Sequence, residues 1–262
     1  MPGLSIADVS KTFTVDGKPF VALEGATLNL APGEFGALIG PSGCGKSTLL
    51  RMVADLVAPS SGTITLDDAP PRTARLRHDI GFVFQEATLL PWRSVLDNIR
   101  LPLEMLGTQG KRGALTPAEL VQLVGLNGFE HARPSQLSGG MQQRCAIARA
   151  LAVAPRILLL DEPFGALDEI TRYRMNFELL RIWSQTGTTA LMVTHSIDEA
   201  VLMADRIFVL AARPGRIVDV VEVDLPRPRR FEHIETPAFG VLTDRVRRSL
   251  FSDIEQRFEH AA

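Results

Sequence analysis

The sequence lacks the features that mark several classes of protein. Only two cysteines, Cys44 and Cys145, occur among 262 residues, and they form no Cys-x-x-Cys pair, which favours a reduced, cytosolic setting. The formal net charge is only -2, so the basic excess typical of nucleic-acid-binding domains is missing. No apolar run approaches the ~18 residues that span a bilayer, and the most apolar late stretch is interrupted by Asp205 and Arg206. Any membrane role is therefore expected to come through a partner.

The first residues also lack the basic start and apolar stretch of a signal peptide, so none is expected. The sequence contains no internal repeat and no low-complexity segment. With 45% hydrophobic and 22% charged residues, it has ample material for a core. This composition predicts one large globular domain, or one domain with an inserted subdomain.

Short apolar runs predict an α/β fold. Four of them, residues 34–40, 80–85, 156–162 and 188–195, are followed by helical patterns, as buried parallel strands covered on both faces would be. The first 30 residues instead alternate apolar and polar side chains around a turn at Asp16 and Gly17. That alternation predicts a small N-terminal antiparallel sheet.

The strand pattern disappears between residues 86 and 135. Residues 89–105 and 117–124 are predicted to be helices, joined by a polar surface linker at 107–113. This segment therefore indicates a helical subdomain, at about residues 86–155, inserted into the α/β core. Near the end, four apolar residues recur every four positions and predict an amphipathic helix: Val246, Leu250, Ile254 and Phe258. The simplest interpretation is that this helix packs back on its own domain.

A phosphate-binding loop is the clearest motif. Residues 40–47, "GPSGCGKS", fit the pattern G-x-x-x-x-G-K-[S/T] in full, through Gly40, Gly45, Lys46 and Ser47. An apolar run precedes the loop and a helix is predicted after it, to about residue 56, which argues against a chance glycine-rich turn. The glycines let backbone N–H groups wrap phosphates, the lysine reaches the β- and γ-oxygens, and the serine hydroxyl can bind Mg²⁺. Cys44 lies inside the loop, so we expect a maleimide to react there and to block nucleotide binding.

Two carboxylates end another buried strand. Asp161 and Glu162 follow the apolar run "ILLL", where charges are costly unless they face a cation or solvent. Ligands of open parallel sheets bind beyond the carboxyl ends of the strands, which suits Asp161 to a Mg²⁺ shell and Glu162 to an attacking water. The alternative is a solvated acidic loop.

Gln85 and His195 end the other two predicted strands. Each residue alone is better explained by a structural hydrogen bond. Together with the phosphate loop and the two carboxylates, however, they would converge on one rim of the sheet, where a triphosphate would bind. The joint pattern favours a nucleotide site.

A second anion site is predicted from "LSGGMQQR", residues 137–144. Ser138 is a good helix N-cap, and Gly139 and Gly140 leave bare N–H groups at the positive end of a helix dipole. One domain with one nucleotide does not need two such sites.

The whole set resembles the ATP-binding-cassette family of ATPases over roughly residues 4–230. The order and spacing match for the phosphate loop, Gln85, "LSGGMQQR", "LLLDEP", "GALD" and His195. The resemblance implies a P-loop NTPase core that binds ATP and Mg²⁺ and hydrolyses the ATP. It assigns the nucleotide to these residues: Gly40, Ser42, Gly43, Gly45, Lys46, Ser47 and Thr48. It further implies that Ser47, Gln85 and Asp161 surround the Mg²⁺ ion. In the same way it implies that Glu162 polarises the attacking water and that His195 contacts the γ-phosphate. Phe13 is the candidate for stacking on adenine, or else an apolar residue of the small sheet.

In this family two such domains pair head to tail, which explains the second anion site. Ser138, Gly139 and Gly140 would bind the ATP held by the partner's phosphate loop, and Asp168 of "GALD" would touch the partner. The family's commonest sequence has glutamine where this chain has Met141, which puts one polar contact to the partner's nucleotide in doubt.

Residues 84–99 and 213–229 look like those of nitrate/sulfonate/taurine-type importers. This likeness implies a bacterial uptake ATPase at the cytoplasmic face of the membrane. Its partners would be a second ATPase subunit, expected to be identical, two membrane permease subunits and, indirectly, an external solute-binding protein. Residues 1–230 would form the ATPase domain, and 231–262 a helical tail too short for a regulatory domain. The alternatives are an importer of another small solute, a soluble mechanical ATPase and a small-molecule kinase. A soluble mechanical ATPase would need a coiled-coil insert or two cassettes in one chain, and this sequence has neither. A small-molecule kinase would need no "LSGG" helix.

Overall fold

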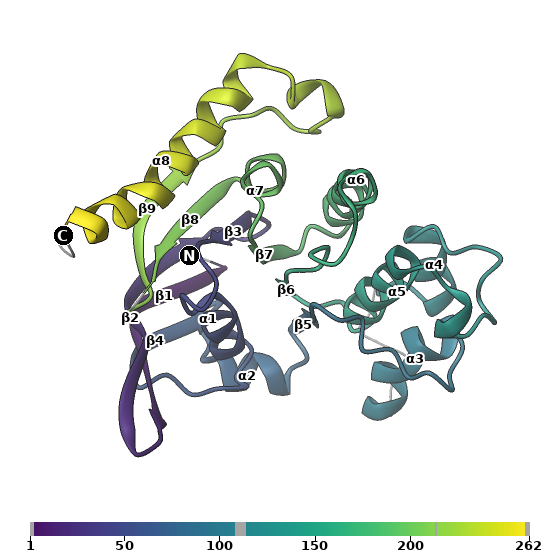
Figure 1. The fold of residues 1–262 in the computed structure, drawn as a ribbon. Helices are drawn as coiled ribbons and strands as arrows, with labels where there is room; N and C mark the ends of the chain where they lie inside the picture. The colour runs from purple at the N-terminus through teal and green to yellow at the C-terminus, as the bar shows by residue number, and fades with distance from the viewer. Residues whose placement is uncertain (1–2, 108–113, 213, 260–262) are drawn as a thin grey trace. The chain divides into compact units, whose positions relative to one another are not determined.

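The computed structural model describes residues 3–107, 114–212 and 214–259, with side chains up to residue 251. These residues form two compact units (Figure 1). The first unit combines the described parts of 1–73 and 189–262, and the second is Ala74–Thr188. Among the helices that the structure describes, none is both long and apolar enough to cross a bilayer.

The first unit contains the predicted antiparallel sheet. Its order is β2-β1-β4, with β1 at Leu4–Val15, β2 at Lys18–Leu30 and β4 at Ser61–Leu66. Asp16 and Gly17 connect β1 to β2 with φ angles of 50° and 74°, the left-handed conformation that a two-residue hairpin turn requires. The predicted alternation and turn are confirmed.

A mainly parallel group of strands lies beside it in the same unit, in the order β7-β3-β8-β9. β7 (Thr189–Thr194), β3 (Phe35–Ile39) and β8 (Arg206–Ala211) are parallel, and β9 (Arg216–Glu222) returns antiparallel. Every side chain of β3 and β7 is buried, as expected for strands covered on both faces. Helices α1 (Lys46–Val53) and α7 (Ile197–Met203) pack against these strands.

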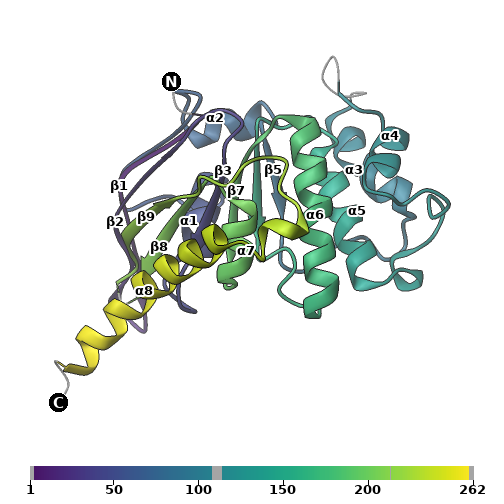
Figure 2. The same cartoon turned by 90° about the horizontal axis from the view of Figure 1, so that it is seen from above.

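The C-terminal helix α8, Pro237–Glu259, follows a short 3₁₀ turn, η2, at Phe231–His233. It contacts α7, β8 and β9, as Figures 1 and 2 show, so it packs on its own unit as the simplest interpretation predicted. Val246 is fully buried, and the Ser249 hydroxyl donates to Asp219 of β9 at 2.6 Å. The helix begins well before the four-residue repeat, and the side chains of Ile254 and Phe258 lie outside the described residues.

The second unit pairs β5 (Ile80–Val83) in parallel with β6 (Ile157–Asp161), both within the runs predicted to be strands. α2 (Pro71–Leu76) leads into it. Its other helical elements are α3 (Val95–Leu106), α4 (Pro117–Leu123), η1 (Pro134–Gln136), α5 (Gly139–Leu151) and α6 (Glu169–Thr186). α3 and α4 both contact α5, which places a helical layer beside the two strands.

The prediction of a helix from residue 89 was wrong at its start, because α3 begins at Val95. Ser94 is its N-cap and accepts from Asp97 N at 3.1 Å. The buried amide of Asn98 reaches back, accepting from Leu90 N at 2.8 Å and donating to Leu90 O at 3.2 Å. These bonds give the preceding turn an alternative to helical hydrogen bonding. Most of the predicted linker, residues 108–113, lies outside the described residues.

Candidate functional site

The phosphate loop, residues 40–48, connects β3 to α1 in the first unit. Gly43 and Gly45 have φ angles of 75° and 94°, a conformation that L-residues rarely adopt. A side chain at Gly40 would place its Cβ 2.5 Å from Leu210 O, so only glycine fits there. The loop therefore presents backbone N–H groups at the start of a helix, the arrangement that binds phosphate. α1 ends at Val53, slightly earlier than predicted.

Lys46 is held in place within this loop. Its side chain is buried, and Nζ donates to Gly40 O at 2.7 Å and to Pro41 O at 2.9 Å. Ser42 and Gly43 are exposed at the outer part of the loop, while Ser47 and Thr48 are half-buried in the first turn of the helix. A buried cation below an open cradle of N–H groups favours a polyphosphate ligand.

His195 lies at the same edge of the first unit. Ile39, the last residue of β3, pairs directly with Thr194, the last residue of β7, so the phosphate loop and His195 leave neighbouring strands. His195 itself is exposed. The Thr194 hydroxyl donates to Glu199 of α7 and accepts from Ser196 N, which fixes the backbone on both sides of the histidine.

Phe13 is half-buried on β1, opposite Phe20 of β2. The Lys11 ammonium lies 5.0 Å from the centre of its ring, a cation–π distance. The aromatic face is therefore engaged within the antiparallel sheet. Its proposed stacking on adenine stays a prediction.

The second unit brings Gln85 and Glu162 together. β5 and β6 are parallel neighbours in which Val83 pairs with Leu160, so the residues that follow both strands meet at one edge. The Gln85 amide donates to a Glu162 carboxylate oxygen at 3.4 Å. Asp161, just before, is only 6% exposed.

Glu162 has a φ of 47°, an unusual backbone conformation for glutamate. Such residues cost about 1–3 kcal/mol and persist where the surrounding structure holds them, commonly at functional sites. The tight turn includes a bond from Gly165 N to Glu162 O at 3.1 Å. The unusual φ angle is consistent with a backbone that sets the direction of the Glu162 carboxylate.

The donor set fits Mg²⁺ chemically. Ser47 of the first unit and Gln85 and Asp161 of the second offer a hydroxyl, an amide oxygen and a carboxylate, the hard oxygen ligands that Mg²⁺ prefers. No group of three or more His, Cys, Asp or Glu side chains in the described ranges could hold a metal by itself. Mg²⁺ commonly binds through one or two carboxylates together with substrate phosphates, so such a protein cage is not required.

The second predicted anion site opens α5, which we call the signature helix. Ser138 caps it, with Oγ accepting from Met141 N at 3.3 Å. Ser138 and Gly139 are exposed and Gly140 is buried, so the start of the helix faces solvent. The N-cap prediction is confirmed.

Asp168 caps α6 in the same unit. Its carboxylate accepts from Thr171 N at 3.0 Å, and the hydrogen bonds from Thr171 hold the pKa of this exposed carboxyl below its ordinary value. Ile170, two residues on, is 84% exposed. A charged cap beside an exposed apolar side chain suits a contact with another protein.

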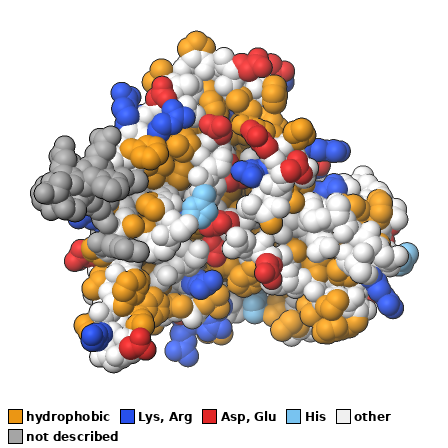
Figure 3. Space-filling view, in the orientation of Figure 1, with side chains coloured by type: hydrophobic (Ala, Val, Ile, Leu, Met, Phe, Trp, Pro, Cys, Tyr) orange, Lys and Arg blue, Asp and Glu red, His pale blue; other side chains and the backbone are white. Residues whose placement is uncertain are grey.

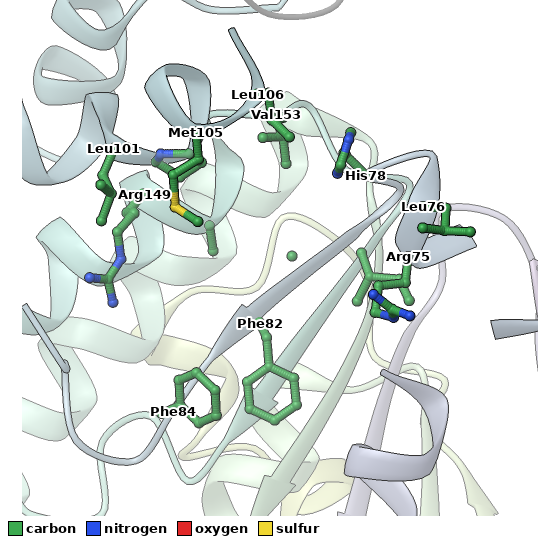
Figure 4. Close-up of a pocket in the computed structure, with 14 residues that line it drawn as sticks. Arg75, Leu76, His78, Phe82, Phe84, Leu101, Met105, Leu106, Arg149 and Val153 are labelled. Atoms are coloured by element: carbon green, nitrogen blue, oxygen red, sulfur yellow. The ribbon is translucent and has the colours of Figure 1, made fainter. Parts of the chain in front are cut away.

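The second unit contains a groove, in the helical region after Gln85 where the family resemblance implies that a helix of the membrane subunit docks. It has a volume of ≈ 510 Å³ and is lined by strand, turn and helix residues (Figure 4). Phe82 and Phe84, with ring centres 4.4 Å apart, face Met105 and Leu101 of α3 across the space. Met105 is 78% exposed, an apolar residue on a helix that its own unit does not cover, which the sequence pattern could have indicated.

Both cysteines are buried, which argues against the expectation that a maleimide reacts with Cys44. The Cys44 residue lies within the phosphate loop with 0% exposure. Burial raises the pKa of Cys44, although Lys46 opposes the rise, and burial raises the pKa of Cys145 to about 12. Thiols that are buried and protonated are poor nucleophiles.

We therefore expect neither cysteine to react with a maleimide in the folded protein. Labelling should be at least about 100-fold slower than in denaturant, because it requires local unfolding. Mass spectrometry after timed labelling, with Cys44→Ser and Cys145→Ser as separate controls, measures this. Fast labelling of the Cys145→Ser protein would contradict the buried position of Cys44.

Comparison with known proteins identifies the family. Residues 23–165 match the family described as ABC transporter. The nitrate import ATP-binding protein NrtD of Synechococcus elongatus is 43% identical over 261 residues, 96% of this chain and 91% of that protein. The taurine import ATP-binding protein TauB of Yersinia pestis is 48% identical over 206 residues, 78% of each.

A solved structure agrees. The dimeric post-hydrolysis state of the ATP-binding cassette MJ0796, bound to ADP and Pi, has a TM-score of 0.72 and 34% identity, covering 85% of this chain and all of that one. The fold and the phosphate loop thus define an ATP-hydrolysing α/β enzyme of the P-loop type. The chain belongs to the ABC transporter family, and the resemblance inferred from its motifs is confirmed.

Proposed function

We propose that this protein is the ATPase subunit of a bacterial importer of the nitrate/sulfonate/taurine type. The observation that carries the proposal is a phosphate loop with a buried, fixed lysine in a chain 43% and 48% identical to nitrate and taurine import ATP-binding proteins. Which solute is carried would be decided by the membrane subunits and by an external binding protein. The subunit would act at the cytoplasmic face of the membrane.

Hydrolysis is assigned to residues of both units. Lys46 and the loop backbone, with Gly40, Ser42, Gly43, Gly45 and Thr48, would bind the phosphates, and Phe13 the adenine. Ser47, Gln85 and Asp161 would hold Mg²⁺, which neutralises phosphate charge when bound. Glu162 would orient and deprotonate the attacking water, and His195 would donate to the γ-phosphate. Phosphoryl transfer depends mainly on positioning and charge stabilisation, which this set provides.

Each ATP molecule would be bound between two copies of this chain. In the proposed head-to-tail dimer, the exposed start of the signature helix at Ser138, Gly139 and Gly140 would close over the nucleotide of the partner, and Asp168 would contact the partner chain. A pair of identical chains would make an isologous two-fold contact with two composite sites. Residues 1–230 would form the ATPase domain, with the helical subdomain at about 86–155, and residues 231–262 the tail.

The groove of Figure 4 would receive a short helix from the membrane permease subunit. Its lining is mainly apolar and aromatic, and it begins at Phe84, one residue before Gln85. Docking of an amphipathic helix into an apolar groove uses exposed side chains such as Met105 as contacts. Figure 3 shows one face of the molecule, on which acidic and basic side chains are mixed with apolar ones.

Met105→Asp tests the docking. A carboxylate in the apolar groove should weaken binding to co-expressed permease subunits by at least about tenfold, because the charge would lose its hydration there. ATP hydrolysis by the isolated ATPase should stay within about twofold of wild type, since Met105 is not among the residues assigned to nucleotide binding or hydrolysis. Pull-down with the permease subunits and transport into proteoliposomes are the measurements.

Val241→Asp is the matched control, an exposed apolar residue on α8 outside the groove. It should leave both docking and transport unchanged. Wild-type docking by Met105→Asp would contradict the position of the partner helix. Hydrolysis without any binding to permease subunits, even in the wild type, would instead favour a soluble ATPase.

A further inference from the structure

The loop that follows β5, residues 84–90, contains Gln85 and is held by two side chains of the signature helix. We call it the Gln85 loop. Gln143 donates from Nε2 to Phe84 O at 3.1 Å, on the residue directly before Gln85. Arg149 donates to Ala87 O at 2.9 Å and to Thr88 O at 2.9 Å. Both ends of the five-residue segment 84–88 around Gln85 are therefore fixed to one helix.

The bond from Gln143 is part-buried. Gln143 itself is only 4% exposed, whereas Phe84, which accepts the bond, is 39% exposed. Removing the Gln143 amide takes away a bond that a buried side chain donates to the backbone of the Gln85 loop. Gln143 thus fixes the backbone position from which the Gln85 side chain extends.

Arg149 holds a strained turn. Thr88 has a φ of 45°, a genuine outlier for a β-branched residue. The guanidinium bonds this residue twice, at its carbonyl and at its hydroxyl, the latter at 3.0 Å, in addition to Ala87. A planar fork with several fixed donors can stabilise such a conformation, whereas a single ammonium group cannot make all three bonds.

The two residues lie on the same helix whose start is the second anion site. The helix runs from Gly139 to Leu151, with Ser138 as its cap. A displacement of this helix would pull on the Gln85 loop through Gln143 and Arg149. Arg149 also lines the groove of Figure 4, so the same side chain is present at the surface proposed to receive the permease helix.

We propose that Gln143 and Arg149 are positioning residues that set the place of Gln85 by fixing its loop to the signature helix. The inference rests on the proposed function, in which Gln85 serves hydrolysis. Neither residue touches substrate in this assignment. Both act through Gln85, and this dependence can be measured.

A double-mutant cycle with Gln85→Ala tests the proposal. Gln143→Met and Arg149→Met, which keep bulk but remove the donors, should each lower kcat for ATP hydrolysis by about tenfold, because each substitution removes bonds that hold the Gln85 loop in place. KM for ATP should stay within about twofold, because the phosphate loop is unchanged. In the Gln85→Ala background, the same two substitutions should lower kcat by less than about twofold, because the residue through which they act is already gone.

The signature helix offers matched controls. Gln142 donates to Pro134 O at 3.0 Å and Leu137 O at 3.3 Å, and Arg144 donates to Val124 O and Gly125 O, both at 3.1 Å. These residues make the same kinds of bond to segments other than the Gln85 loop. Gln142→Met and Arg144→Met should therefore change kcat by the same factor whether residue 85 is glutamine or alanine.

Hydrogen exchange provides a second readout that does not depend on hydrolysis. Amides of residues 84–90 should exchange about tenfold faster in Gln143→Met and Arg149→Met, and at the wild-type rate in the two controls. Unchanged exchange would overturn the proposal even if the ATPase assignment holds. Equal factors in both backgrounds of the cycle would also overturn it. Loss of the Gln85→Ala effect on kcat would instead show that the role of Gln85 is wrong, and the proposal with it.

Discussion

Glu162→Gln is expected to abolish ATP hydrolysis while leaving ATP binding intact. Glu162 follows β6 in a strained backbone conformation and accepts a hydrogen bond from Gln85, so its carboxylate is held at the edge where the strand ends. Glutamine keeps the shape and the oxygen but cannot take a proton from water. Loss of a general base typically lowers the rate by about 10²–10⁴-fold. Because ATP would bind but not be hydrolysed, no products would form, and the variant should accumulate as an ATP-bound dimer.

Two measurements check this expectation. Steady-state phosphate release should fall by that factor, and size-exclusion chromatography with ATP should show a larger fraction of dimer than for the wild type. Glu232→Gln, which removes an exposed carboxylate in the 3₁₀ turn before α8, is the control and should hydrolyse ATP normally. Near-wild-type turnover by Glu162→Gln would assign the general base to another residue. Loss of ATP affinity would show that the glutamate serves binding instead.

Features set by short-range pattern could be predicted from the sequence. Each of the four runs predicted to be buried strands contains a strand, β3, β5, β6 and β7, because continuous apolar stretches have few alternatives to a covered strand. The buried strand β8 was not among the predicted runs. The N-cap at Ser138 and the hairpin turn at Asp16 and Gly17 were predictable for the same reason, since each depends on a few neighbouring residues.

Features set by contacts distant in sequence could not be predicted. α3 starts later than predicted because the Asn98 side chain forms hydrogen bonds with the backbone of Leu90. Helix propensity does not take such a side-chain bond into account. The Cys44 thiol is buried because the loop turns it toward Gly40. The bonds from Gln143 to Phe84 and from Arg149 to Thr88 join residues about 60 positions apart, which spacing alone does not reveal.

Ser138→Arg is the substitution that best distinguishes the role of the phosphate loop from that of the predicted anion site at the start of the signature helix. Ser138 and Gly139 are exposed at the start of the signature helix, whereas Lys46 is buried in the phosphate loop of the other unit. A bulky cation at position 138 leaves the phosphate loop of its own chain untouched, so ATP affinity of the monomer should stay within about twofold of wild type. It should block ATP-driven dimerisation, because substitution at the centre of an interface commonly weakens association by about 30-fold or more. Ser184→Arg, an exposed serine on α6, is the matched control and should dimerise normally.

Mixing two defective chains then tests which site serves which nucleotide. Lys46→Ala removes the loop cation, and Ser138→Arg removes the signature contact, so neither chain alone should form a stable dimer with ATP. A mixed dimer contains one rebuilt site, which combines the intact phosphate loop of the Ser138→Arg chain with the intact signature helix of the Lys46→Ala chain. It should bind one ATP per dimer, measured by native mass spectrometry, because each composite site needs one element from each chain. Monomeric Ser138→Arg that loses ATP affinity as severely as Lys46→Ala would place the signature helix in the site of its own chain. The head-to-tail arrangement would then be wrong, and the second anion site would need another ligand.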